Sequence, residues 1–206
     1  EYRPGDGQYT WFKAPRYEGE PCEVGPLARV LVAYGKGHNE IVPLVNGVIQ
    51  KLGIEAKHLF STLGRTAARG IETVVIGEAM QDWVGELVDN LKAGNVATFE
   101  PYEIPDSGMG VGLNDVPRGA LGHWVRIEDK KIANYQYVVP STWNLGPRDE
   151  KGKLGPVEEA LIGTPIADPK KPLEVLRTVH SFDPCIACGV HVIDPESNEV
   201  YEIKVI

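Results

Sequence analysis

The chain has 206 residues, 42% of them hydrophobic, which is enough for one sizeable core or two small ones. Its formal net charge of −8 argues against nucleic-acid binding, which requires clustered lysine and arginine. No stretch approaches the roughly 18–20 apolar residues of a membrane span, and no N-terminal signal pattern is visible. The first residue is Glu rather than Met, so we expect a segment of a longer reading frame or a processed end.

The N-terminal half predicts an extended arm followed by helices. Residues 1–22 are rich in Gly, Pro and aromatic residues and predict an arm that packs by its rings. Apolar spacing predicts a helix over 26–35, with Pro in its first turn. A second helix is expected over 40–52, capped by Asn39 and closed by a glycine. One long helix is expected over 56–92.

The second half predicts fewer regular elements. Repeated Gly and Pro predict a loop over 95–117. Alternating apolar residues predict one β-hairpin over 123–139 with a charged turn. A second Pro- and Gly-rich loop is expected over 140–156, followed by short helices starting at Pro156 and Pro172. The fold class is therefore mainly α with a small β-hairpin, without a clear domain linker.

The strongest local motif for chemistry is a CxxC sequence near the C-terminus. Asp183 and Pro184 are typical of a helix cap and first turn. One helical turn would place Cys185 and Cys188 on the same face, and a helix N-terminus lowers the pKa of a thiol. Two such thiolates suit a soft metal, and His191 lies three residues further on as a third candidate ligand.

Four interpretations of this motif remain open from the residues alone. The two cysteines could form a redox pair, although that motif usually follows a strand. They could bind zinc together with His191 and the remote Cys22, or form a buried pair without metal. They could also be half of a metal site that another segment completes. Cys22 by itself is typical of a small buried core residue.

Two further segments contain candidate site residues. Arg118 lies between Pro and Gly in a stiff turn, where it could aim a guanidinium at a charged centre or be an ordinary surface arginine. Ser141 and Thr142 follow the expected hairpin, where either hydroxyl could donate a hydrogen bond into a site or cap a turn.

Seven short motifs, taken together, resemble the large subunit of nickel–iron hydrogenases, in the order in which that family has them. They are APRY at 14–17, EVGPLAR at 23–29, GRTAAR at 64–69, PRGALGHW at 117–124, NYQ at 134–136, VPSTWN at 139–144 and FDPC at 182–185. They extend along nearly the whole chain. The form is similar to the periplasmic enzymes of sulfate-reducing bacteria. The resemblance implies the long-helix bundle of the hydrogenase large subunit.

The resemblance also implies a nickel–iron centre, with CO and CN ligands on the iron, held by four cysteines. Cys185 would be a terminal nickel ligand, and Cys188 would bridge nickel and iron. Arg118 would lie over the open side of the metals and help to split H2, with Asp183 holding it in place. An arginine is nearly always protonated, so electrostatic help is easier to defend than general-base catalysis.

Further roles follow from the same resemblance. Ser141 would donate a hydrogen bond to a cyanide, and Pro140 would line the same pocket. His191 and the main-chain carbonyl of Tyr137 would bind a magnesium or iron ion. A maturation endopeptidase would cut between His191 and Val192. Residues 1–191 would then be the C-terminal part of the large-subunit domain, and 192–206 a propeptide.

The chain lacks the family's N-terminal CxxC and its functional glutamates, so we expect a fragment that is inactive alone. Three cysteines cannot hold a cubane iron–sulfur cluster. Electrons from reversible H2 oxidation would therefore pass to an iron–sulfur small subunit, the partner in a heterodimer. Metal-insertion factors and export to the periplasm with that subunit are also implied. A non-catalytic zinc-binding module and a metal-free relative resembling complex I are the alternatives.

Overall fold

The computed structural model describes residues 9–10, 12–185, 189–193 and 200–204, with the side chains of 189–193 and 201–204 outside that description. The helices are α1 (Pro26–Gly35), α2 (Ile41–Leu52), a 3-10 helix (Ala56–Leu59), α3 (Thr62–Lys92), α4 (Pro140–Asn144), α5 (Pro156–Leu161) and α6 (Leu173–Ser181). The strands are β1 (Ser107–Val116), β2 (Gly119–Glu128), β3 (Lys131–Val138), β4 (Gly189–Ile193) and β5 (Val200–Lys204).

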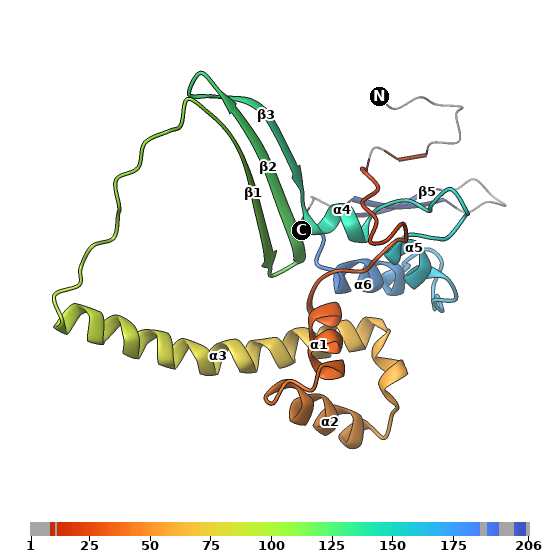
Figure 1. Cartoon of the computed structure of the whole chain (residues 1–206). Coiled ribbons are helices and arrows are strands. Elements are labelled where there is room, and N and C mark those ends of the chain that lie inside the picture. The colour runs from red at the N-terminus through yellow and green to blue at the C-terminus, as the bar shows by residue number, and fades with distance from the viewer. Residues whose placement is uncertain (1–8, 11, 186–188, 194–199, 205–206) are drawn as a thin grey trace.

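The hydrophobic core lies where α1 and α2 pack against the first half of α3 (Figure 1). Its buried members come from these helices and from the 3-10 helix between them: Leu27, Val30, Ile41, Val45, Leu59, Ala68 and Ile71. The helices predicted over 26–35 and 40–52 are confirmed, and Gly53 closes α2 in the left-handed conformation. The predicted Asn39 cap is wrong, because Glu40 occupies the cap position without a side-chain hydrogen bond.

The expected helix over 56–92 is divided into two pieces. The 3-10 helix comes first, and α3 starts at Thr62 because the Ser61 side chain accepts a hydrogen bond from the amide of Gly64. α3 then continues for 31 residues, and every residue from Met80 to Lys92 is exposed. Within the described part, the second half of α3 extends away from the other helices (Figure 1). The expected bundle of long helices is therefore not seen here.

Strands β1, β2 and β3 form a three-stranded antiparallel sheet in that order. The loop predicted over 95–117 is wrong for its second part, because β1 pairs with β2 from Ser107↔Glu128 to Val116↔Gly119. Glycines alternate with apolar residues in β1, and this composition by itself favours a loop. The segment is a strand because its backbone N–H and C=O groups form hydrogen bonds with β2 along the whole of that strand. The predicted charged turn is confirmed: Asp129 and Lys130 both have positive φ.

The short elements near the C-terminal end lie beside the core helices (Figure 1). Pro140 starts α4, inside the segment 140–156 expected to be a loop, because proline fits a first helical turn. The helices expected after Pro156 and Pro172 are confirmed as α5 and α6. β4 and β5 form a separate antiparallel pair, and β1 also pairs with β2, so one predicted hairpin was too few.

The arm contacts the segment that leads to α5, as the ring-rich sequence predicts. Tyr9 donates a hydrogen bond to the Glu158 carboxylate, and the Arg148 guanidinium lies 4.9 Å from the centre of the Tyr9 ring. Arg16 donates to the carbonyl of Pro147. Across the part of the chain that is described, no helix is long and apolar enough to cross a membrane.

Candidate functional site

The turn that carries Arg118 is pressed against the start of α1. Gly119 has a φ of +131° and Gly25 a φ of +117°, a region that side-chain-bearing residues rarely adopt. A Cβ on Gly119 would lie 2.6 Å from the Val24 side chain, and one on Gly25 would lie 2.8 Å from the Arg118 carbonyl oxygen. Glycine at both positions therefore lets the Arg118 turn approach α1 closely.

Arg118 and Asp183 meet, as predicted. The Arg118 Nε donates to the Asp183 main-chain carbonyl at 2.9 Å and lies 3.3 Å from its carboxylate. Both side chains are about 40% exposed. Asp183 has a φ of +52°, so this residue turns the chain after α6. The terminal amino groups of Arg118 are the ones left to face a bound charge.

Ser141 and Cys185 are also brought together. The Cys185 amide donates to the Ser141 hydroxyl at 2.9 Å, across 44 residues of sequence. Ser141 is buried in α4, whereas the Cys185 residue is exposed. A hydroxyl that accepts a hydrogen bond keeps its own hydrogen to donate. Ser141 can therefore fix the backbone of Cys185 and still donate to a second group.

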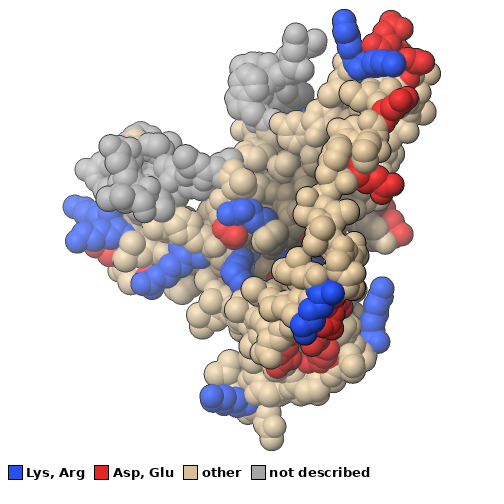
Figure 2. All heavy atoms as spheres, turned by 90° about the vertical axis from the view of Figure 1, so that its left-hand side faces the viewer, with Lys and Arg blue, Asp and Glu red and all other residues tan. Residues whose placement is uncertain are grey.

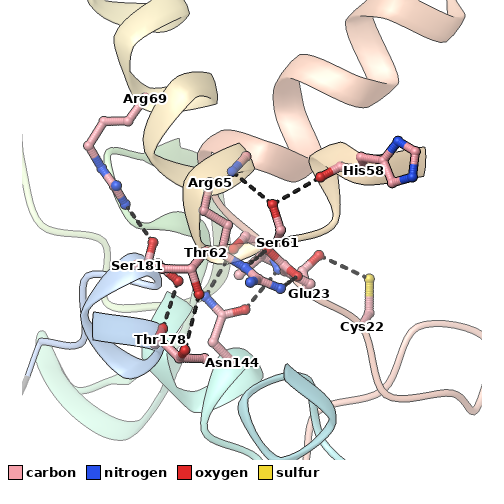
Figure 3. Close-up of polar contacts among 12 residues, drawn as sticks. Cys22, Glu23, His58, Ser61, Thr62, Arg65, Arg69, Asn144, Thr178 and Ser181 are labelled. Carbon is pink, nitrogen blue, oxygen red and sulfur yellow. Dashed lines mark hydrogen bonds and ion pairs between the residues drawn. The ribbon is translucent and has the colours of Figure 1, made fainter. Parts of the chain in front are cut away.

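A buried ion pair joins Arg65 of α3 to Glu23 (Figure 3), and the same arginine contacts the segment before Cys185. Arg65 donates from Nε and Nη2 to the two carboxylate oxygens of Glu23, each at 2.8 Å. Its guanidinium carbon also lies 3.9 Å from the centre of the Phe182 ring. Arg65 is only 7% exposed, so this desolvated cation of α3 joins two other segments: Glu23, just before α1, and Phe182, just before Asp183.

Two more contacts join α3 to the end of α6 (Figure 3). Arg69 donates to the Ser181 carbonyl at 3.1 Å. The hydroxyls of Thr62 and Thr178 lie 3.1 Å apart, and Thr178 is buried. Successive turns of α3 therefore each contribute a side chain that fixes the last turn of α6, from which the Cys185 motif continues.

The Asn144 side chain joins α4 to Val24, which lies just before α1. Its amide nitrogen donates to the Val24 carbonyl and its amide oxygen accepts from the Val24 N–H, both at 2.9 Å. The side chain is 2% exposed. Since Ser141 belongs to the same short helix, this pair of hydrogen bonds fixes the helix that contacts Cys185.

The remaining predicted residues are placed less completely. Pro140 is buried at the start of α4, next to Ser141. Tyr137 lies in β3 opposite His123, with the two rings stacked. Cys188 lies outside the described residues. The backbone of His191 lies in β4 opposite Glu202, but its side chain lies outside the description.

The predicted helical turn at the CxxC motif is wrong at its start. Neither Asp183 nor Pro184 is helical, because the positive φ of Asp183 sends the chain away from the axis of α6. Cys185 occupies a bend, and β4 begins at Gly189. Ser141, rather than a helix N-terminus, contacts the Cys185 amide.

The described donor groups fit one part of a metal site. Cys185, two residues after the Arg118 partner Asp183, is exposed and offers a thiol, a soft donor of the kind that nickel accepts. Among the side chains that the structure describes, no group of three His, Cys, Asp or Glu residues could hold a metal. Cys22 is partly buried and contacts the Glu23 carbonyl; burial, followed by the nearby Glu23 charge, raises the pKa of its thiol.

A cleft of about 770 Å³ lies between α1, α3 and the turn that precedes Arg118, with Asp183 among its lining residues. Most of its lining is apolar, including Val30, Ile76 and Met80. The sequence analysis did not predict this cleft, because it lies between elements that are distant in the chain.

Four residues that build the site received no role from the sequence: Glu23, Arg29, Arg65 and Asn144. One signal was available for Arg65, which lies three residues before Ala68 and six before Ile71 on the core face of α3. A charged residue in that row indicates a buried partner, since buried arginines are nearly always paired. No comparable signal identifies Val24 as the partner of Asn144.

Comparison with known proteins gives a consistent result. The model of the nickel-dependent hydrogenase family matches residues 1–191. The uptake hydrogenase large subunit of Bradyrhizobium diazoefficiens is 48% identical over 97% of this chain and 34% of its own length. The hydrogenase-2 large chain of Escherichia coli is 46% identical over 98% of this chain and 37% of its own length.

Solved structures agree with the sequence comparisons. The NiFeSe hydrogenase of Desulfomicrobium baculatum superposes with a TM-score of 0.74 at 41% identity, covering 88% of this chain and 37% of that one. The Ni-Fe-Se hydrogenase of D. vulgaris Hildenborough gives a TM-score of 0.71 at 37% identity, covering 88% and 38%. The helices and the three-stranded sheet of this chain thus match the hydrogenase large-subunit fold.

The chain belongs to the nickel-dependent hydrogenase family. Its curated relatives are large subunits of hydrogenases, and it spans about a third of their length. The resemblance drawn from the seven motifs is therefore confirmed, and nickel and iron are the metals that the family and its solved members support.

Proposed function

We propose that this chain is the C-terminal part of the large subunit of a nickel–iron hydrogenase. The complete protein would catalyse reversible oxidation of H2 to two protons and two electrons. One observation carries the proposal: Arg118, Ser141 and Asp183, from three separate segments, converge on the backbone around Cys185. Those are the residues to which the family motifs assign the metal pocket.

In the proposed site, Cys185 and Cys188 would supply two of the thiolates that hold the metals. The bound metals, with CO and CN on the iron, would supply the place where H2 binds and the acceptor for its two electrons. Ser141 would donate its remaining hydrogen to a cyanide, and buried Pro140 would line that pocket. The chain itself supplies two thiolates, so the other two must come from the rest of the large subunit.

The Arg118 guanidinium would act by its fixed charge. Its Nε is occupied by Asp183, which leaves the terminal amino groups pointing elsewhere. A cation held beside a reacting centre stabilises negative charge that develops there without moving during the reaction. Arg118 would therefore assist the splitting of H2, whose complete oxidation yields two protons and two electrons, and Asp183 would keep Arg118 oriented.

The proposal also includes a magnesium or iron site and the removal of the propeptide, residues 192–206. His191 and the Tyr137 carbonyl would bind magnesium or iron, and a maturation endopeptidase would remove residues 192–206. The family match ends at residue 191, in agreement with that boundary. The bond between His191 and Val192 lies within β4, so β5 would be the strand released.

Exposed apolar surface supports a partner that covers α3 and the sheet. Between Val74 and Leu91, eight large apolar residues of α3 are between 41% and 58% exposed, far more than a finished domain leaves on one helix. They are Val74, Ile76, Met80, Trp83, Val84, Leu87, Val88 and Leu91. Figure 2, which faces the end of α3, shows a hollowed surface with uncharged areas between separate clusters of charged side chains.

The rest of the large subunit and the iron–sulfur small subunit are the proposed occupants of this surface. The matched relatives have about two-thirds of their length outside the match, which is enough chain to cover it. Electrons would leave through the small subunit, and export of both subunits would place the enzyme in the periplasm. Metal-insertion factors would act before the tail is cut.

The test is a comparison of Cys188→Ser with Cys22→Ser in the full-length large subunit, produced with its small subunit. The first variant should contain no nickel and show no H2 uptake, because a serine hydroxyl does not replace a bridging thiolate. The second should retain both, since Cys22 contacts a main-chain carbonyl in the arm. H2 uptake by Cys188→Ser would overturn the proposal. One zinc per chain, lost in both variants, would instead favour the non-catalytic zinc module.

A further inference from the structure

The Arg29 side chain joins three elements at the edge of the site. From α1 it donates to both carboxylate oxygens of Glu72 in α3, at 2.5 and 2.9 Å. It also donates to the Asp115 carboxylate at the end of β1. Its terminal amino groups reach the main-chain carbonyls of Val116 and Pro117, each at 2.9 Å.

All five N–H donors of this guanidinium are therefore used. One of the two carbonyls belongs to the peptide group between Val116 and Pro117, and the other to the peptide group between Pro117 and Arg118. Fixing both carbonyls fixes the direction in which the chain enters Arg118. On the other side, the absence of side chains at Gly25 and Gly119 allows the same turn to lie close to the start of α1.

The arrangement requires an arginine. The Arg29 side chain is 26% exposed and Glu72 is 22% exposed, so this pair is partly shielded from water, whereas Asp115 is 48% exposed. The hydrogen bonds that Arg29 donates to Glu72 are the main cause that raises the pKa of Arg29, which stays protonated throughout the working pH range. A lysine has three donors on one atom and could not reach both carboxylates and both carbonyls at once.

We propose that Arg29 is a positioning residue for Arg118, holding the Val116 and Pro117 carbonyls so that the Arg118 guanidinium stays over the metal pocket. This inference rests on the proposed function, in which Arg118 acts on H2. It assigns to Arg29 an indirect role, because Arg29 acts through Arg118 and through the turn that precedes it.

The test is a double-mutant cycle in the full-length enzyme with its small subunit. Arg29→Lys should lower kcat about tenfold, because a small displacement of a catalytic group costs one to two orders of magnitude. The KM for H2 and the nickel content should not change. The Arg29→Lys/Arg118→Lys enzyme should be no slower than Arg118→Lys alone, since coupled residues are not additive. Arg126→Lys is the matched control, because the one ion pair that Arg126 forms among the described residues is with exposed Glu128; it should match the wild type.

Two results of the activity and nickel measurements would overturn the inference. One is a double variant slower than Arg118→Lys by a further factor of about ten; the other is loss of nickel in Arg29→Lys, which would indicate a purely structural role. Hydrogen exchange gives a readout independent of catalysis: the Arg118 and Gly119 amides should exchange faster in Arg29→Lys, and unchanged exchange would also overturn the inference. If exchange accelerates but the wild-type enzyme oxidises no H2, the positioning contact stands and the proposed function fails.

Discussion

Replacement of Arg65 by lysine tests how the Cys185 segment is anchored. Lysine keeps the positive charge but can replace only one of the two hydrogen bonds to Glu23, and it lacks the flat guanidinium that covers Phe182. A hydrogen bond to a charged group contributes about 1.5–3 kcal/mol, and a desolvated cation–ring contact about 0.5–2 kcal/mol. With Arg65 buried, we expect Arg65→Lys to lower the free energy of unfolding by about 2–4 kcal/mol.

Urea unfolding followed by tryptophan fluorescence measures this loss. With a slope of about 2–3 kcal/mol per molar urea, the midpoint should fall by about 1 M or more. Arg126→Lys is the control, since Arg126 forms an exposed ion pair with Glu128 and its replacement should cost less than about 1 kcal/mol. Equal midpoints for the two variants would refute the reasoning, because burial and the Phe182 contact would then contribute nothing.

Two further predictions concern the turn and the free thiols. Gly119→Ala should destabilise the chain by about 3 kcal/mol or more from strain and overlap with Val24; Gly152→Ala, with φ +83° and open space, should cost about 1 kcal/mol in the same unfolding assay. Cys22 should be alkylated more slowly than exposed Cys185 at pH 8, as read by mass spectrometry, because burial raises the pKa of the Cys22 thiol. Since its folded pKa is raised, this thiol contributes stability that is full below the unfolded pKa and is lost as pH rises through the folded value. Faster labelling of Cys22 would contradict the observed burial.

The helices could be predicted because their apolar residues follow the helical repeat. Leu27 and Val30 in α1, and Ile41 and Val45 in α2, form one buried row each. β1 could not be predicted in the same way. Its glycines carry no side chain to show alternation, and its pairing with β2 decides its structure.

The candidate site could be predicted only in part. The family motifs indicated Arg118, Ser141, Asp183 and Cys185, and the structure brings Arg118 to Asp183 and Ser141 to Cys185. The residues that position them were missed, because their partners are distant in sequence. Arg65 and Glu23 are 42 residues apart, a separation that no local pattern records.

The contacts that place Cys185 also impose an order of assembly during synthesis. Every group that receives the Cys185 segment precedes it in the chain: Arg69 is translated 112 residues before its partner Ser181, and Ser141 44 residues before Cys185. At about 5–20 residues per second, Arg69 leaves the ribosome's active centre roughly 6–20 s before Ser181 is added. The surface that includes Arg69 and Ser141 can therefore fold first. Cys185, which follows α6, then packs against a surface that has largely formed. A nascent chain that stalls before α6 would contain Arg118 and Ser141 without Asp183 and Cys185, the residues that they contact in the folded chain.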